Sequence, residues 1–179
     1  MRRMRDRGAV LMESAIILPL LLMLAIGLSE GGMALYDWLA VSNATREGAR
    51  IGASAGDLSS GGTTADTLIL DAVAQASCAI RNGEVTQVRV YKSNASGVMI
   101  GSSQNVYTLN SVNCSTLTAS WTTNTFNWSP STRNNTLNNL DTLGLEVTFE
   151  HESLTGLFTW FEGTHTDRAW MRLDPDTSG

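Results

Sequence analysis

Glu13 is the residue of this chain whose type and position most need a chemical explanation. It is the only charge in an otherwise apolar run over residues 9–28, and it stands five residues after Gly8. A charge at the centre of a bilayer costs at least about 2.5–3.5 kcal/mol, so a carboxylate in such a run indicates a specific role. Four arginines precede the glycine, namely Arg2, Arg3, Arg5 and Arg7.

The apolar run has the length of a membrane span. A helix needs about 20 residues to cross a hydrocarbon core roughly 30 Å thick. A secretory signal peptide fits less well, because its apolar centre is about 7–15 residues long and ends at a small-x-small site, which residues 29–34 do not provide. A plain membrane anchor fits the hydropathy, but it does not account for the spacing of Gly8 and Glu13.

The residues around this spacing resemble a known family. Arg7-Gly8 followed by Ala-Val-Leu-Met-Glu13 resembles the processing site of type IV prepilins, where a short basic leader ends in glycine. The stretch 8–19, together with Arg-Glu-Gly-Ala-Arg at 46–50, resembles more narrowly the TadE-like minor pilins (pseudopilins) of the tight-adherence, or Flp, pilus system. The tail at 168–174 resembles the closing strand of that family. The chain departs from the family at Ser14, where an aromatic residue or alanine is common.

The resemblance implies a processing step and a role for the carboxylate. A prepilin peptidase would cut between Gly8 and Ala9, and Glu13 would then meet the new amine of Ala9 on a neighbouring subunit. The two groups lie four residues, or about 6 Å, apart along a helix. Removing one partner of a buried ion pair costs about 3–5 kcal/mol. The pair would therefore act as a checkpoint for assembly, because subunits packed without it would be strongly disfavoured. The alternative is a Glu13 side chain that extends to the headgroups at the cytoplasmic end of the span.

Charge indicates the orientation and excludes some partners. The formal charge is −5, and loss of residues 1–8, with four arginines and Asp6, leaves −8. An acidic mature surface argues against nucleic acid or anionic lipid as the main partner. The basic leader predicts a single pass through the inner (cytoplasmic) membrane, with the N-terminus in the cytoplasm and the remainder outside.

Cys78 and Cys114 are the only cysteines, and their even number in an exported chain predicts a disulfide. Closing the loop between them is worth on the order of 3–4 kcal/mol in the chain-entropy model. The sequence has no CxxC motif, and two cysteines with two distant histidines do not make a zinc site.

A helix is expected from residue 9 to about 51. Pro19 could kink it, and Gly27, Gly31 and Gly32 mark a plausible place for a bend or a break. Beyond them, small residues recur at every fourth position: Ala40, Ala44, Gly48 and Gly52. Such a stripe lets another backbone approach closely. The partner is either the sheet of this chain or the helix of a neighbour.

The remainder predicts a small α+β domain. A second helix should begin at residue 63 or 64 and end near 82–83, and strands are expected at 84–92, 143–151 and 166–173. Residues 93–139 read as a loop-rich insertion with short strand candidates at 104–109 and 117–122. Residues 154–161 form either a short helix or a hydrophobic loop. The aromatic cluster within them is expected in the core, with a contact patch on another pilus subunit as the alternative: Leu157, Phe158, Trp160 and Phe161.

No catalytic constellation emerges from the sequence. His151 stands between Glu150 and Glu152, but consecutive strand residues face opposite sides of a sheet, and His165 is equally isolated. We therefore expect no enzyme activity, no cofactor and no metal site.

The expected architecture is an α+β, lollipop-shaped pilin. It has a leader at 1–8, an N-terminal helix at 9–56 with its span at 9–28, and an extracytoplasmic domain at 57–179. The expected function is that of a minor pilin in assembly of a tight-adherence pilus for surface adhesion or biofilm. Its partners would be the membrane, the prepilin peptidase and other pilus subunits. The alternative is an uncleaved single-span protein whose external domain binds a ligand or partner.

Overall fold

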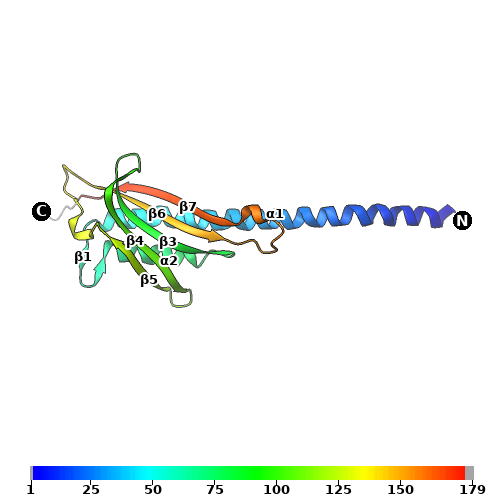
Figure 1. The fold of residues 1–179 in the computed structure, drawn as a ribbon, viewed down its shortest axis with the longest axis horizontal. Helices are drawn as coiled ribbons and strands as arrows, with labels where there is room; N and C mark the ends of the chain where they lie inside the picture. The colour runs from blue at the N-terminus through cyan, green and yellow to red at the C-terminus, as the bar shows by residue number, and fades with distance from the viewer. Residues whose placement is uncertain (1, 176–179) are drawn as a thin grey trace.

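A single long helix carries the whole domain on its C-terminal half. The computed structural model describes residues 2–175, and helix α1 runs without interruption from Arg2–Ala55. Its N-terminal half projects alone, while its C-terminal half lies against the sheet and the second helix (Figure 1). This arrangement confirms the predicted α+β, lollipop-like fold.

The sheet has five antiparallel strands in the order β5-β4-β3-β6-β7. A two-stranded hairpin, β1 and β2, leads from α1 into the second helix α2. The elements after α1 are β1 Ser59–Ser60, β2 Thr63–Thr64, α2 Ala65–Ser77, β3 Gly83–Ser93, β4 Met99–Asn113, β5 Thr118–Phe126, η1 Pro130–Thr132, β6 Thr142–His151, η2 Thr159–Phe161 and β7 Gly163–Arg172.

The core lies between one face of the sheet and the two helices. Alternate residues of β6 fill it, because successive strand side chains point to opposite faces. These β6 residues are Leu143, Leu145, Val147 and Phe149, all at most 1 % exposed. Val88 and Val90 of β3 join them, with Ile69 and Val73 of α2 and Val41 of α1.

The start of α2 follows the expected capping chemistry. The Thr64 hydroxyl accepts a hydrogen bond from the Thr67 backbone N–H at 3.1 Å, and the Thr67 hydroxyl accepts one from the Thr64 N–H at 2.9 Å. This reciprocal pair satisfies two N–H groups that a helix start leaves without partners. The helix ends at Ser77, earlier than the turn expected at 82–83.

The predicted bend or break at the helix glycines is wrong, since α1 passes through Gly27, Gly31 and Gly32 and through Pro19. Two of these glycines make room for aromatic rings instead. A Cβ at Gly27 would lie 3.1 Å from Phe158 Cζ, and one at Gly31 would lie 3.3 Å from Phe161 Cζ. The glycines therefore serve the packing of a distant loop on the helix.

The expected loop-rich insertion at 93–139 contains long strands. β4 has 15 residues and β5 has nine, well beyond the short candidates at 104–109 and 117–122. Polar side chains bond across this hairpin: Asn110 Nδ2 donates to the Thr122 hydroxyl at 3.0 Å, and Asn124 Nδ2 donates to the Thr108 hydroxyl at 3.0 Å. A hairpin that is polar on much of its surface shows little of the hydrophobic alternation by which strands are recognised.

The aromatic cluster expected in the core is at the surface. Trp160 is 76 % exposed and Leu157 is 62 % exposed, while Phe158 and Phe161 are half-buried against α1. The residues lie in the loop between β6 and β7 rather than on a strand face, so they stay outside the core and only α1 covers part of the cluster.

Candidate functional site

The part of α1 that carries the candidate processing and assembly residues stands clear of the domain. Gly8 is exposed, and a Cβ built on it would meet nothing within 4 Å. Glu13 is exposed as well, and no hydrogen bond or ion pair joins it to a described side chain. α1 is long and apolar enough to cross a membrane once, and its most apolar window is not buried by the rest of the chain. Gly8 and Glu13 are thus accessible to a partner from outside this chain.

The stripe of small residues contacts the chain's own domain at its C-terminal end. A Cβ at Gly48 would lie 2.7 Å from Leu145 Cδ2, and one at Gly52 would lie 2.6 Å from Ile69 Cδ1. Side chains at these positions would therefore collide with β6 and α2. The sequence left open which partner packs on the stripe of small residues. At Gly48 and Gly52 that partner is this chain's own sheet and second helix.

The N-terminal half of the stripe borders an open groove. Ala44 is buried and Ala40 is half-buried, and both line a shallow groove with Ala72 and Ala76 of α2. The groove lies between α1 and α2, and alanines of both helices line it together with larger side chains such as Tyr36 and Leu39.

A buried carboxylate on α1 ties the helix to two other elements. Asp37 is fully buried, and its Oδ2 lies 3.0 Å from His151 Nδ1 at the end of β6. Its two oxygens also accept the backbone N–H groups of Arg81 at 2.9 Å and Asn82 at 3.2 Å. Three partners therefore compensate the cost of burying this group.

A second buried carboxylate lies two turns earlier on the same helix. Glu30 is 2 % exposed, and its Oε1 accepts the backbone N–H of Thr155 at 2.8 Å and also the Thr155 hydroxyl. Its other oxygen, Oε2, has no hydrogen-bond partner among the described residues. Glu30 fixes the loop between β6 and β7 to the helix just past the expected span.

Sequence reasoning missed both acids. Glu30 and Asp37 are spaced seven residues apart, and Val41, Ala44 and Gly48 continue the same stripe. Residues spaced three, four or seven apart share a helix face, so this spacing is the signal that could have placed the two carboxylates on the buried side.

A polar cluster attaches the insertion to α2. The Asp66 carboxylate of α2 pairs with Arg133 and accepts hydrogen bonds from Asn105 Nδ2 and the Tyr107 hydroxyl, both at 2.7 Å. The Arg133 guanidinium lies 4.5 Å from the centre of the Trp128 ring, a cation–π contact. Burial, reinforced by the negative Asp66, raises the pKa of Tyr107. These contacts bind segments that are up to 67 residues apart in the chain.

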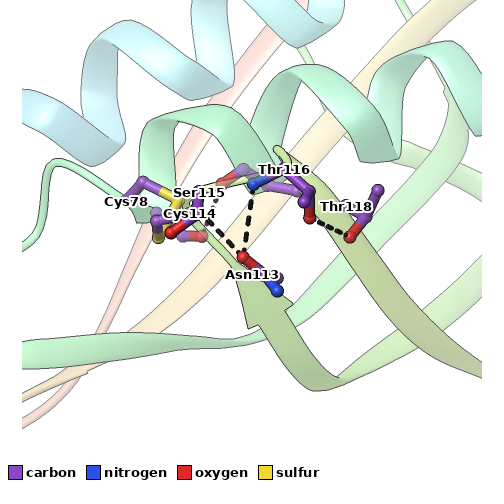
Figure 2. The surroundings of a disulfide bond; sticks show 8 residues. Cys78, Asn113, Cys114, Ser115, Thr116 and Thr118 are labelled. Carbon is purple, nitrogen blue, oxygen red and sulfur yellow. Dashed lines mark hydrogen bonds between the residues drawn. A yellow bond between two sulfur atoms is a disulfide. The ribbon is translucent and has the colours of Figure 1, made fainter.

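The disulfide predicted from the two cysteines is present. Cys78 follows α2 and Cys114 follows β4, with their Cα atoms 5.5 Å apart (Figure 2). The turn that carries Cys114 is closed by Asn113, whose Oδ1 accepts the backbone N–H groups of Ser115 at 3.0 Å and Thr116 at 3.2 Å. The bond therefore joins the second helix to the outer hairpin of the sheet.

The two histidines, treated separately in the sequence, border one apolar recess. His151 and His165 line it with Trp38, Trp160 and Phe161. The His165 ring lies 5.5 Å from that of Phe149, and His151 is held by Asp37. Among residues 2–175, no three His, Cys, Asp or Glu side chains converge in a way that would hold a metal ion. Glu150 points away from His151, toward the Thr164 hydroxyl on the outer face.

Comparison with known proteins finds one family. Residues 8–50 match the model of the family described as TadE-like protein. No curated protein and no solved structure matches the chain. The matched segment contains Gly8, Glu13 and the 46–50 stretch, so it confirms the resemblance on which the sequence interpretation rested, and it stops before the sheet.

Proposed function

We propose that this chain, TadE-like over residues 8–50, is a minor pilin or pseudopilin that acts in assembly of a tight-adherence (Flp) pilus for surface adhesion or biofilm. The observation that carries the proposal is the coincidence of the family match with the exposed half of α1. This half projects from the domain and presents Gly8 and Glu13 without a partner from the domain.

Processing would create the second half of the assembly contact. A prepilin peptidase of the inner membrane would remove residues 1–8, and Ala9 would gain a positively charged amine. Glu13 is the one acidic residue within the span, so it is the natural partner for such an amine on an axially displaced neighbour. Because unpaired charges are costly in the membrane, the pair favours one register between adjacent helices.

The charge pattern and the disulfide both support the proposed topology. The four leader arginines favour a cytoplasmic N-terminus by the positive-inside rule. The Cys78–Cys114 disulfide supports a domain on the opposite, oxidising side, since such bonds persist mainly outside the cytoplasm. The role we propose is structural rather than enzymatic: a folded domain carried on a helical stalk.

The test is Glu13→Ala in cells that carry the full pilus system, with Ser14→Ala as the matched control in the same turn. The Glu13 variant should insert in the membrane and still be cleaved, but it should fail to co-purify with other pilus subunits, and piliation should fall. The Ser14 variant should behave as wild type. Normal piliation and normal subunit contacts with Glu13→Ala would contradict the proposal.

A further inference from the structure

The loop between β6 and β7 is apolar and exposed. Its nine residues from 153 to 161 carry no charge. Three large side chains in it are mainly exposed to solvent: Leu154 at 67 %, Leu157 at 62 % and Trp160 at 76 %. Clustered exposed apolar side chains of this kind mark an interaction site in a soluble or membrane-attached domain.

α1 holds this loop at one fixed position along the helix axis. The Phe158 ring covers Gly27, and the Phe161 ring covers Gly31 one turn later. Between them, the Glu30 carboxylate accepts both the backbone N–H and the hydroxyl of Thr155. Three attachments within five residues of α1 leave the loop little freedom to move along the helix.

This position along α1 coincides with the outer end of the expected span. Gly27 is the second-last residue of the apolar run at 9–28. Phe158, Trp160 and Phe161 border an apolar groove whose other wall is α1 from Leu20 to Leu28, a stretch of about 12 Å at 1.5 Å per residue. In Figure 1 the orange segment that contains the loop lies alongside α1 at the end of the domain nearest the N-terminus.

The loop surface is therefore continuous with the lipid-facing surface of the helix. If residues 20–28 lie in the bilayer, side chains that share a groove with them reach the level of the headgroups. Tryptophan is enriched at that level, because its ring is amphipathic. Apart from the buried Glu30, two carboxylates flank the loop, Glu152 and Glu162, and they stand at its base beside the strands. Glu162 accepts the Ser153 hydroxyl at 2.6 Å.

We propose that this loop is a second membrane contact of the protein, in which Leu154, Leu157 and Trp160 insert into the outer-leaflet interface of the bilayer that α1 spans. The proposal rests on the membrane span in the proposed function. The loop and the helix together fix the height and tilt of the domain above the membrane. A subunit that leaves the bilayer must then withdraw both.

The experiment measures lipid contact of single labelled positions. The full chain is placed at one copy per lipid nanodisc, with one added cysteine carrying a polarity-sensitive fluorophore, and the native cysteines remain paired. Three variants are compared: Leu157→Cys in the loop, Leu18→Cys in the span and Leu137→Cys in the domain. Leu137 is 71 % exposed, and it lies two residues from Asn135, which donates a hydrogen bond to Asp57 just beyond the end of α1. The end of α1 is about 42 Å from Gly27 along the helix axis, so position 137 is far from the loop. Quenching is measured as the loss of fluorescence in discs with nitroxide-labelled lipids relative to discs without them.

We expect quenching at positions 157 and 18 and none at 137. Quenching at 18 without quenching at 157 would overturn the membrane contact and leave the span intact. The absence of quenching at both 18 and 157 would contradict the span itself, and the membrane contact with it. Equal quenching at 157 and 137 would show that the label reports no specific contact of the loop, which also overturns the proposal.

Discussion

Asp37 and His151 stand 114 residues apart in the sequence and form one buried hydrogen-bonded pair, with 3.0 Å between Asp37 Oδ2 and His151 Nδ1. The pair joins the helical stalk to the end of β6, and the same carboxylate holds the turn that leads into β3. The stalk and the domain are therefore joined by a buried polar contact as well as by the apolar core.

We expect Asp37→Ala to destabilise the domain by about 3–5 kcal/mol, because it leaves the buried His151 ring and the backbone N–H groups of Arg81 and Asn82 without their acceptor. Thermal unfolding of the detergent-solubilised full chain, followed by tryptophan fluorescence, measures the change. Asp71→Ala, at an exposed position of α2, is the control and should leave the melting temperature nearly unchanged. Equal melting temperatures for the two variants would contradict the fastening role of Asp37.

Substitution of a glycine in the stripe should lower the stability of the domain, whereas the same substitution at an exposed glycine of α1 should not. Gly52→Val places two methyl groups where Ile69 and Leu143 already lie within 3.0 Å of the new Cβ. Overpacking of this kind costs about 1–3 kcal/mol. Gly32→Val meets nothing within 4 Å and should change the stability by less than about 0.5 kcal/mol. A Gly52 variant as stable as the Gly32 variant would show that α1 does not pack on the domain at this depth.

The disulfide should stabilise the domain through the unfolded chain. Replacing both cysteines by serine should cost on the order of 3–4 kcal/mol, since the loop between Cys78 and Cys114 is long. A reductant should lower the melting temperature of the wild type to that of the double variant and leave the variant unchanged. Intact-mass analysis without reductant should show the loss of two hydrogens, and two free thiols in fresh protein would contradict the bond.

Tyr107 should make the domain sensitive to high pH. Its folded pKa is raised above the ordinary value of about 10, by burial first and by the neighbouring Asp66. The protonated phenol stabilises the fold below pH 10, and this stabilisation is lost as the pH rises from 10 toward the folded pKa. The difference in melting temperature between wild type and Tyr107→Phe should therefore shrink from pH 8 to pH 10.5. A difference in melting temperature that stays constant with pH would mean that Tyr107 has the same pKa in the folded and the unfolded protein.

The sequence predicted those elements whose side chains alternate or cap clearly. The strand expected at 143–151 is β6, Thr142–His151, because its apolar residues alternate. Of the two threonines expected at the start of α2, Thr63 and Thr64, it is Thr64 that caps the helix. The Cys78–Cys114 bond followed from the count of cysteines together with the expected export of the chain.

Long-range polar contacts and a loop that packs on a helix could not be read from local pattern. Asp37 meets His151, and Asp66 meets Arg133, only after the sheet has formed. The glycines at 27 and 31 suggested a weak point in the helix, since their partners Phe158 and Phe161 lie more than a hundred residues away. The same aromatic residues suggested a core, because composition does not distinguish a buried cluster from an exposed loop.

The most direct test of the central claim is the N-terminal sequence of the mature protein, isolated from cells that hold the prepilin peptidase. We expect a mature N-terminus at Ala9. Gly8→Val should abolish processing, whereas Gly32→Val, at a second exposed glycine of α1, should be processed normally. Mature protein that retains Met1 in these cells would contradict processing at Gly8 and favour an uncleaved single-span protein.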